Sequence, residues 1–197
     1  MRLASIDVGV RNLAFVVLDV GADEAVVRVW RSASAVPAST CVRGMCKTAA
    51  AEAVMRALDE HADELLECDT VLVEAQPRFS PLNVQTAHAI VAYFVLRKRV
   101  DMCEGVAVHL VHAGRKNAWA TTHAAPRGAS RGQKYARNKN EAAAACAEIV
   151  ARGGCARLRR GWDAFKKKDD AADALVQALA WLGRPRATAR VVAAEFF

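Results

Sequence analysis

The chain of 197 residues is long enough for one domain with a sizeable hydrophobic core, and we expect a single domain spanning residues 1–197. Hydrophobic residues make up 53% and charged residues 25%, which is typical of a folded globular protein, although alanine supplies much of the apolar content. The net charge of +7 is uneven: residues 97–168 contain 17 Lys and Arg but 5 Asp and Glu, so this middle segment carries +12 and the remainder −5. Such a basic segment favours binding to phosphates, with a solvated basic surface as the alternative.

The first half of the chain predicts four strands and a long helix. A hairpin is expected where the chain turns at Gly9, and an alanine-rich stretch with apolar residues at helical spacing predicts an amphipathic crossover helix. The strands are expected over Leu3–Val8, Leu13–Val20, Val26–Trp30 and Thr70–Glu74, and the helix over Lys47–Leu66.

The second half predicts three helices, a fifth strand and two basic loops. Helices are expected over residues 82–99, 138–151 and 169–182, and the strand over Val106–Val111. The Gly, Ser and Arg content of residues 124–134 and 153–168 is typical of loops. Together these elements predict an α/β fold with a five-stranded mixed sheet flanked by helices.

Several classes of protein receive no support. Charged residues at positions 2, 7 and 11 interrupt any early apolar run, so we expect no membrane association and an intracellular protein. The six cysteines form no C-x-x-C pair, and His109 and His112 would point to opposite faces of a strand, so neither a disulfide framework nor a zinc site is expected. No glycine-rich phosphate loop follows a strand, which argues against a nucleotide cofactor.

Two acidic residues are placed where an acid is disfavoured. Asp7 interrupts a strand made of Leu, Ala, Ser, Ile and Val, and Glu74 ends the apolar run VLVE. A single acid of this kind is more often a strand-end residue that is hydrogen-bonded to a turn. Two of them on neighbouring strands favour a functional site.

A second pair of acids, Asp170 and Asp173, stands three residues apart on the last helix. Acids in a first helical turn are also favoured by the helix dipole, which explains Asp169 and Asp170 without any function. The dipole explains Asp173 less well, because this residue lies deeper in a helix that must be buried.

The four acids Asp7, Glu74, Asp170 and Asp173 predict a metal centre. Clustered carboxylates repel one another unless cations neutralise them, and oxygen ligands select Mg²⁺, or Mn²⁺ in its place, over zinc. Two such ions assist phosphodiester hydrolysis in nucleases. The acids and the basic middle of the chain therefore indicate the same substrate, a phosphodiester backbone.

Three segments carry a resemblance to a known family. SIDVGVRNLAF, VLVEAQ and KKDDAADAL together resemble the RuvC-like Holliday junction resolvases of the RNase H-like superfamily, and most of all the poxvirus and mitochondrial branch. In that branch the first acid also lies in an S-I-D-x-G-x-x-N segment, and a Tyr-plus-basic stretch like KYARNKN precedes the penultimate helix. The likeness runs from Ser5 to Leu175.

The resemblance implies a fold, an activity and a set of site residues. Asp7, Glu74, Asp170 and Asp173 match the metal-binding acids, with Asp169 as a substitute for Asp170. The family's catalytic lysine falls on Lys139, with Lys134 as the alternative. The family also implies a RuvC-like fold and a homodimer that nicks a four-way junction symmetrically. A viral enzyme of the host cytoplasm would fit the closer branch.

Contacts with DNA are expected from the basic middle of the chain. Basic side chains would bind phosphates and a tyrosine could stack on an opened base. The candidates are Arg115, Lys116, Arg127, Arg131, Lys134, Tyr135 and Arg137. Each of them could equally be a solvated side chain.

The sequence thus predicts a structure-selective endonuclease that resolves Holliday junctions with two Mg²⁺ ions. Two alternatives keep the same fold. One is a broader flap, branched-DNA or hybrid nuclease, and the other is a non-catalytic nucleic-acid-binding module.

Overall fold

A computed structural model of the chain describes residues 1–100, 106–121 and 130–194. Its centre is a six-stranded sheet with the strand order β5-β4-β1-β2-β3-β6. The strands are β1 (Arg2–Asp7), β2 (Leu13–Val20), β3 (Ala25–Ala33), β4 (Thr70–Ala75), β5 (Ala107–His112) and β6 (Val191–Ala193). β1, β2 and β3 are antiparallel neighbours, whereas β4, β5 and β6 each pair in parallel with the strand beside them.

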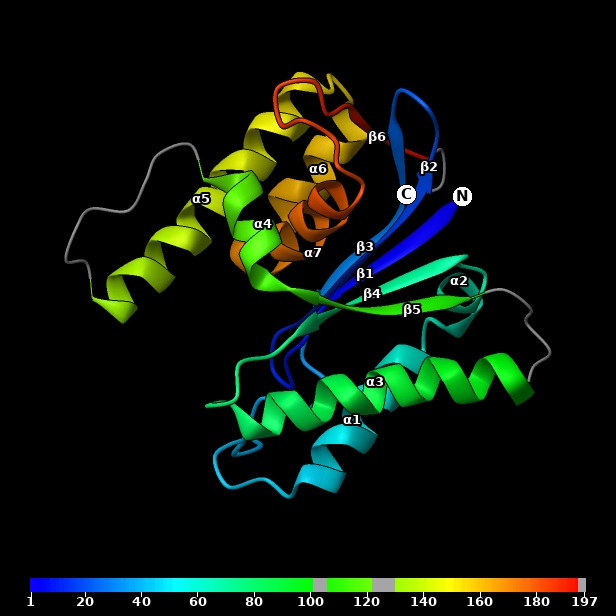
Figure 1. The fold of residues 1–197 in the computed structure, drawn as a ribbon, viewed down its shortest axis with the longest axis vertical. Coiled ribbons are helices and arrows are strands. Elements are labelled where there is room, and N and C mark those ends of the chain that lie inside the picture. The colour runs from blue at the N-terminus through cyan, green and yellow to red at the C-terminus, as the bar shows by residue number, and fades with distance from the viewer. Residues whose placement is uncertain (101–105, 122–129, 195–197) are drawn as a thin grey trace.

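Helices cover both faces of this sheet (Figure 1). On one face lie α1 (Lys47–Asp59), α2 (Ala62–Leu66) and α3 (Pro81–Val100). On the other lie α4 (Ala113–Ala120), α5 (Arg131–Arg152), α6 (Ala156–Ala164) and α7 (Lys168–Trp181). None of the helices in the described ranges is both long and apolar enough to cross a membrane.

The hairpin at the start of the sheet forms as expected. β1 and β2 pair from Arg2 opposite Asp19 to Asp7 opposite Ala14. A side chain at Gly9 would place its Cβ 2.9 Å from the carbonyl oxygen of Asn12, so this tight turn accepts only glycine. The turn sets the register that brings Asp7 to the end of β1.

The alternation of side chains along β1 sends its residues to two separate cores. Leu3 packs against α7, while Ala4 and Ile6 pack toward α1 and α3. Ser5 faces α7, where it accepts a hydrogen bond of 3.1 Å from Gln177 Nε2. Asp7, two residues further, therefore points to the same side.

Small side chains allow α7 to lie against the middle of the sheet. Ala171, Ala172, Ala174 and Ala178 are buried without exposed surface, and so is Leu175. Alanine brings helix and sheet backbones close together, so the alanine-rich composition is a packing feature of this layer. Every residue from Asp170 to Ala180 is buried.

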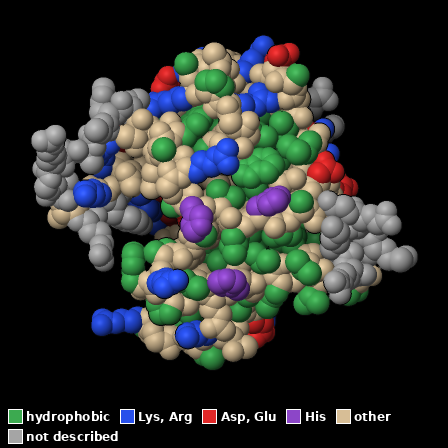
Figure 2. Space-filling view, in the orientation of Figure 1, with side chains coloured by type: hydrophobic (Ala, Val, Ile, Leu, Met, Phe, Trp, Pro, Cys, Tyr) green, Lys and Arg blue, Asp and Glu red, His purple; other side chains and the backbone are tan. Residues whose placement is uncertain are grey.

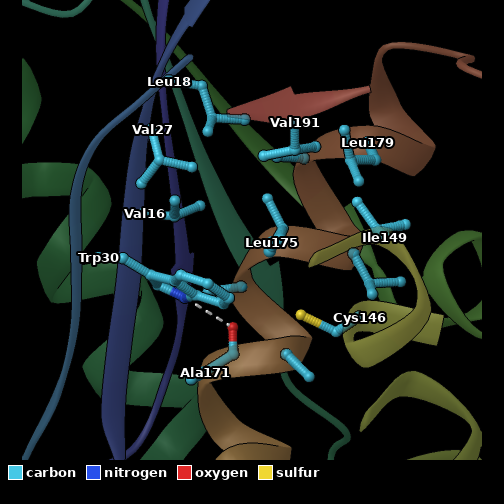
Figure 3. Close-up of a cluster of buried hydrophobic side chains, with 14 of the residues drawn as sticks. Val16, Leu18, Val27, Trp30, Cys146, Ile149, Ala171, Leu175, Leu179 and Val191 are labelled. Atoms are coloured by element: carbon cyan, nitrogen blue, oxygen red, sulfur yellow. Dashed lines mark hydrogen bonds between the residues drawn. The ribbon is translucent and has the colours of Figure 1, made fainter. Parts of the chain in front are cut away.

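Trp30 of β3 joins α6 and α7 to the sheet (Figure 3). Its indole Nε1 donates a 3.0 Å hydrogen bond to the carbonyl oxygen of Ala171. Its ring stacks on Trp162 at a centroid distance of 5.6 Å and meets Phe165 edge-on at 5.0 Å. The start of α7 is thereby fixed against the sheet.

The fold differs from the sequence expectation in several places. A helix, α4, forms where none was expected, and the helix expected over Lys47–Leu66 is divided into α1 and α2. The sheet has six strands instead of five, because the short β6 adds to the edge of β3. Residues 153–168, expected as a loop, contain α6, which buries Leu158 and Trp162 four residues apart on one face. Of the other expected loop, residues 124–129 lie outside the described ranges, and α5 already begins at Arg131, where Ser130 and Gln133 form a capping box.

Candidate active site

Asp7 and Glu74 lie side by side at the ends of two parallel strands. The last paired residues of β1 and β4 are Ile6 and Val73, so Asp7 and Glu74 follow them at the same edge of the sheet. Both side chains point toward α7, and Asp7 is hydrogen-bonded to Glu74. Two carboxyl groups can share such a contact when one of them holds a proton.

Lys116 of α4 and Asp173 of α7 complete a cluster with these two acids. Lys116 Nζ lies 2.9 Å from Glu74 Oε1 and 3.2 Å from Asp173 Oδ2. The Lys116 side chain is only 5% exposed, and those of Glu74 and Asp173 are 11% exposed each. We refer to Asp7, Glu74, Asp173 and Lys116 as the acid cluster.

The acids of the cluster differ in protonation because their surroundings differ. Burial and the negative charge of Glu74 raise the pKa of Asp7 well above its ordinary value. Burial acts in the same direction on Glu74, but Lys116 and hydrogen bonds from Asp7 and Gln76 outweigh it and lower the Glu74 pKa. The hydrogen bond between the two carboxyl groups raises the pKa of Asp7 and lowers that of Glu74, so the lower pKa belongs to the acid beside the ammonium.

The charge on Lys116 is held by the same acids. Burial disfavours an ammonium, yet the carboxyl groups of Glu74, Asp7 and Asp173 together raise the Lys116 pKa above its ordinary value. Burial also raises the pKa of Asp173, and Lys116 opposes this shift. The cluster is a buried ammonium group surrounded by carboxyl groups. Removing the ammonium or its carboxylate partners would leave a buried charge without a partner.

Asp170 belongs to an adjoining group. Lys139 Nζ of α5 lies 2.6 Å from Asp169 Oδ2 and 3.1 Å from Asp170 Oδ1. Lys167 Nζ lies 3.0 Å from Asp170 Oδ2. The carboxylate of Asp170 thus lies between two lysines, and the residue is only 2% exposed. Lys139 also acts electrostatically on Asp173, which shows that this group borders the acid cluster.

The two neighbouring aspartates of α7 are not equivalent. The Asp170 side chain is 3% exposed and the Asp169 side chain 29% exposed. Partial burial raises the pKa of Asp169. The hydrogen bond from Lys139 acts in the opposite direction, and the net pKa of Asp169 lies below its ordinary value. Asp170 is therefore the one that faces the protein interior, whereas spacing alone makes both aspartates neighbours of Asp173.

The donor set of the cluster is chemically suited to a divalent cation. Its carboxylate oxygens are the ligands that Mg²⁺ and Mn²⁺ prefer. Within residues 1–100, 106–121 and 130–194, however, no three His, Cys, Asp or Glu side chains converge closely enough to hold an ion where they stand. Lys116 lies between Glu74 and Asp173, and Asp7 is hydrogen-bonded to Glu74. Binding of a cation requires that these contacts open.

Lys116 is placed differently from its expected position as a DNA contact. Its side chain is buried in ion pairs, so its ammonium is not on the surface that would meet a phosphate. The preceding residue, Arg115, is exposed. The basic pair Arg115–Lys116 at the start of α4 thus divides between surface and interior, which the helical rotation of about 100° between neighbours explains.

The other candidate DNA contacts lie mainly on α5. Lys134 is exposed, and Arg137 is half-buried with its Nε 2.8 Å from Glu141 Oε1. The backbone of Arg131 and Tyr135 is helical, but their side chains, like the whole of Arg127, lie outside the described part of the structure.

Comparison of the sequence with protein-family models and with curated proteins gives no match. Solved structures match over most of the chain. The yeast mitochondrial Holliday junction resolvase Ydc2 has a TM-score of 0.62 at 14% identity, covering 91% of this chain and 78% of its own. The fowlpox virus resolvase, in complex with its substrate Holliday junction DNA, has a TM-score of 0.58 at 16% identity, covering 93% and 97%. RuvC of T. thermophilus, also in complex with a Holliday junction substrate, has a TM-score of 0.51 at 16% identity, covering 91% of each chain.

The chain has the RuvC-like resolvase fold. This confirms the fold that the three sequence segments imply, with one strand more than expected. Within this RuvC-like fold, Asp7, Glu74 and Asp173 come together from β1, β4 and α7, and Asp170 lies beside Lys139.

Two contributors to the site were missed by sequence reasoning. Lys116 was assigned to the surface because its neighbours in the chain are polar. Gln76, which donates a 3.0 Å hydrogen bond to Glu74 Oε2, entered the argument only as part of a motif. Its position two residues after Glu74 was the available signal, since alternate residues of an extended chain point to the same side.

Proposed function

We propose that this protein is a metal-dependent endonuclease that resolves four-way DNA junctions. The observation that carries the proposal is the convergence of Asp7, Glu74 and Asp173 at one edge of the sheet, in a chain with the RuvC-like fold. Buried acids are costly to keep unless they serve a purpose. The basic α5, which supplies Lys139 to the site, is suited to a polyanionic substrate.

In this proposal the acids Asp7, Glu74, Asp170 and Asp173 hold two Mg²⁺ ions, for which Mn²⁺ can substitute. The bound ions supply an activated water and stabilise the leaving oxygen of the phosphodiester. Asp7, whose pKa is raised, would have to be ionised to serve as a ligand, and Lys116 would have to release one of its two carboxylate partners. Lys139, which lies at the rim of the site, offers its ammonium to the phosphate oxygens.

DNA is held in this account by the basic residues around α4 and α5. Arg115 and Lys134 are exposed and contact phosphates, as do Arg127, Arg131 and Arg137, while Tyr135 stacks on an unpaired base. Lys116 is reassigned from these contacts to the acid cluster. Such contacts position the DNA without reading its sequence.

A second copy of the chain would allow paired, symmetric nicks. Large apolar side chains are exposed on α3 and β5: Val95 is 43%, Leu96 60%, Val100 74% and Leu110 43% exposed. Figure 2 shows hydrophobic side chains gathered across the middle of the face that carries these two elements. A surface of this kind is suited to an isologous contact, and we assign the homodimer interface to it.

Cleavage of a panel of synthetic DNAs tests the substrate. The protein with Mg²⁺ is expected to cut a four-way junction at two symmetric positions and to leave a linear duplex of the same sequence intact. Equal cutting of the duplex would contradict junction selectivity. Preferred cutting of flaps or RNA–DNA hybrids would instead establish the broader nuclease.

One observation favours a second candidate, a non-catalytic DNA-binding module. Lys116 already neutralises Glu74 and Asp173, so the cluster is internally paired without any metal. In that case the acids would be structural, and the protein would bind junctions in a salt-dependent way without any Mg²⁺-dependent product. Calorimetric titration with Mn²⁺ separates the two candidates, since a structural cluster binds no ion.

A further inference from the structure

A hollow lined by arginines lies where α6 crosses the end of β3. It has a volume of about 470 Å³. The residues that line it include Arg31, Arg157 and Arg160, together with Ser32, Trp30 and Phe165. We call this feature the arginine hollow. It is distinct from the acid cluster, and it lies in the segment that the sequence predicted as a loop.

The arginine hollow is built on a rigid base. α6 buries Leu158 and Trp162, and the Trp162 ring stacks on Trp30 of the sheet. Arg157 and Arg160 project from this same helix, and Arg31 belongs to β3. Side chains mounted on packed elements lose less freedom when they bind a ligand than side chains of a loop.

The positive charge of the hollow is not neutralised by acids. The residues that line it include no Asp or Glu. Arg157 Nη1 donates a 2.7 Å hydrogen bond to the carbonyl oxygen of Ala194, and Arg31 reaches a carbonyl at 3.5 Å. Arg160 makes no ion pair with any residue in the described ranges. The arginines that line the hollow offer several N–H donors, and no lining acid compensates their charge, an arrangement that an anion stabilises.

The hollow shares a sheet face with the acid cluster. Asp7 of β1 pairs with Ala14 of β2, and Ala14 pairs with Ser32 of β3. Neighbouring strands are about 4.8 Å apart, so the backbone of Ser32 lies about 10 Å from that of Asp7. A DNA strand carries one phosphate per nucleotide, so a strand that reaches the acid cluster can place a nearby phosphate at the hollow.

We propose that the arginine hollow binds a backbone phosphate of the DNA strand that is cut, close to the scissile bond. The inference rests on the proposed function, because it takes DNA as the ligand. α6 thereby extends the DNA-binding surface beyond α4 and α5, on the opposite side of the active site. Arg31 and Arg160 act as phosphate donors, and Arg157 holds the end of β6 as well as facing the hollow.

The test compares two double variants with the same loss of charge. Arg31→Gln with Arg160→Gln removes two guanidinium groups from the hollow. Arg43→Gln with Arg56→Gln removes two exposed arginines on the α1 side of the sheet and serves as the control. Binding of a fluorescent four-way junction is measured by anisotropy in Ca²⁺ over a series of salt concentrations, with thermal melting to check that each variant is folded.

The hollow variant is expected to weaken binding at least about fivefold at moderate salt and to reduce the slope of log Kd against log salt by about 1 to 2. The control variant should change the slope by less than half as much. Equal effects of the two variants, or no binding of DNA by the unaltered protein, would overturn the inference. Cleavage is measured separately. If the unaltered protein cuts junctions but the hollow variant binds them normally, only the inference about the hollow is refuted. If the hollow variant loses binding but the unaltered protein never cuts, only the proposed nuclease activity is refuted.

Discussion

At the scale of single residues, the position of Lys116 changes how the acid cluster should be understood. A buried ammonium that bridges Glu74 and Asp173 offsets the repulsion of acids that face one another across the sheet and α7. Breaking a buried ion pair by removing one partner costs about 3–5 kcal/mol, since the remaining charge stays buried without compensation. Lys116 therefore stabilises the metal-free protein, and in the proposed metal site it would compete with a cation for the same oxygens.

Replacement of Lys116 by Met is expected to lower stability in EDTA by about 3–5 kcal/mol. Mn²⁺ should restore much of this loss, because the freed carboxylates bind it more tightly than in the unaltered protein. Differential scanning fluorimetry in EDTA and in Mn²⁺ measures both effects. The exposed Lys47→Met is the matched control and should respond to neither condition. An unchanged melting temperature of Lys116→Met in EDTA would contradict the assignment.

The raised pKa of Asp7 predicts a pH-dependent effect of Asp7→Asn. Because burial and Glu74 raise the pKa of Asp7 in the folded state, the folded protein keeps a proton that the unfolded chain loses. The contribution of Asp7 to stability therefore falls as pH rises from its ordinary value, about 4, through its folded pKa. Asparagine does not titrate and can still donate to Glu74.

In EDTA, the stability of Asp7→Asn relative to the unaltered protein should therefore increase as pH rises over this window and then level off. Urea unfolding at a series of pH values measures the difference. A difference that stays constant with pH would show that Asp7 keeps an ordinary pKa.

At the scale of elements, sequence reasoning placed the helices and strands best where periodicity was long. β1, β2, β4 and α7 lie where they were expected, because an apolar strand or a long alanine-rich stretch has one plausible period. α6 was missed because its exposed face is so basic that composition resembled a loop, although Leu158 and Trp162 already stood one turn apart. β6 has only three residues, Val191–Ala193, and forms through pairing with β3, which no local pattern specifies.

The position of α7 depends on Trp30, and its truncation should show this. Trp30→Ala removes a ring packed against α6 and α7 together with the hydrogen bond to Ala171, and it should cost about 3–5 kcal/mol. For a chain of this size that is a fall of about 6–20 °C in Tm. Thermal unfolding followed by circular dichroism measures it. Trp30→Phe, which keeps most of the ring volume, should lose less than half as much, and similar losses in both variants would contradict the packing argument.

At the scale of the whole molecule, the residues assigned to DNA and those assigned to the dimer surface lie mainly on different elements. Most of the basic residues that we assign to DNA lie on α4, α5 and α6, on the side of the sheet that carries α7, while the apolar residues that we assign to the dimer surface lie on α3 and β5. A dimer formed through α3 and β5 would leave the basic helices of both copies free for one junction. The uneven charge along the sequence is thus reflected in the layers of the fold.

Leu96→Glu tests the assigned dimer surface. Leu96 and Val100 are neighbours one turn apart on α3. A carboxylate in place of the Leu96 side chain would be desolvated in an isologous contact. Light scattering after gel filtration should give a dimer for the unaltered protein and a monomer for Leu96→Glu. Thr48→Glu, which adds the same charge at an exposed position of α1, should remain a dimer. A Leu96→Glu protein that stays dimeric places the interface elsewhere.

The acidic residues of the candidate site could be predicted from the sequence, but its buried lysine, Lys116, could not. Asp7 and Glu74 stood out because strands at the centre of a sheet rarely contain acids, and Asp170 and Asp173 because of their spacing. No local pattern distinguishes the buried Lys116 from the exposed Arg115 beside it, since only the packing of α4 against α7 decides which side chain points inward. Burial of a charge is a property of the assembled fold.

The central claim is that the acid cluster cuts junctions with the help of divalent cations. Its most direct test is to measure junction cleavage and junction binding in parallel for the unaltered protein and for Asp173→Asn, with and without Mg²⁺. We predict that the unaltered protein cuts only with Mg²⁺, and that Asp173→Asn binds the junction with similar affinity while cutting at least about 100-fold more slowly. Cleavage that is independent of Mg²⁺, or that persists at full rate in Asp173→Asn, would contradict it.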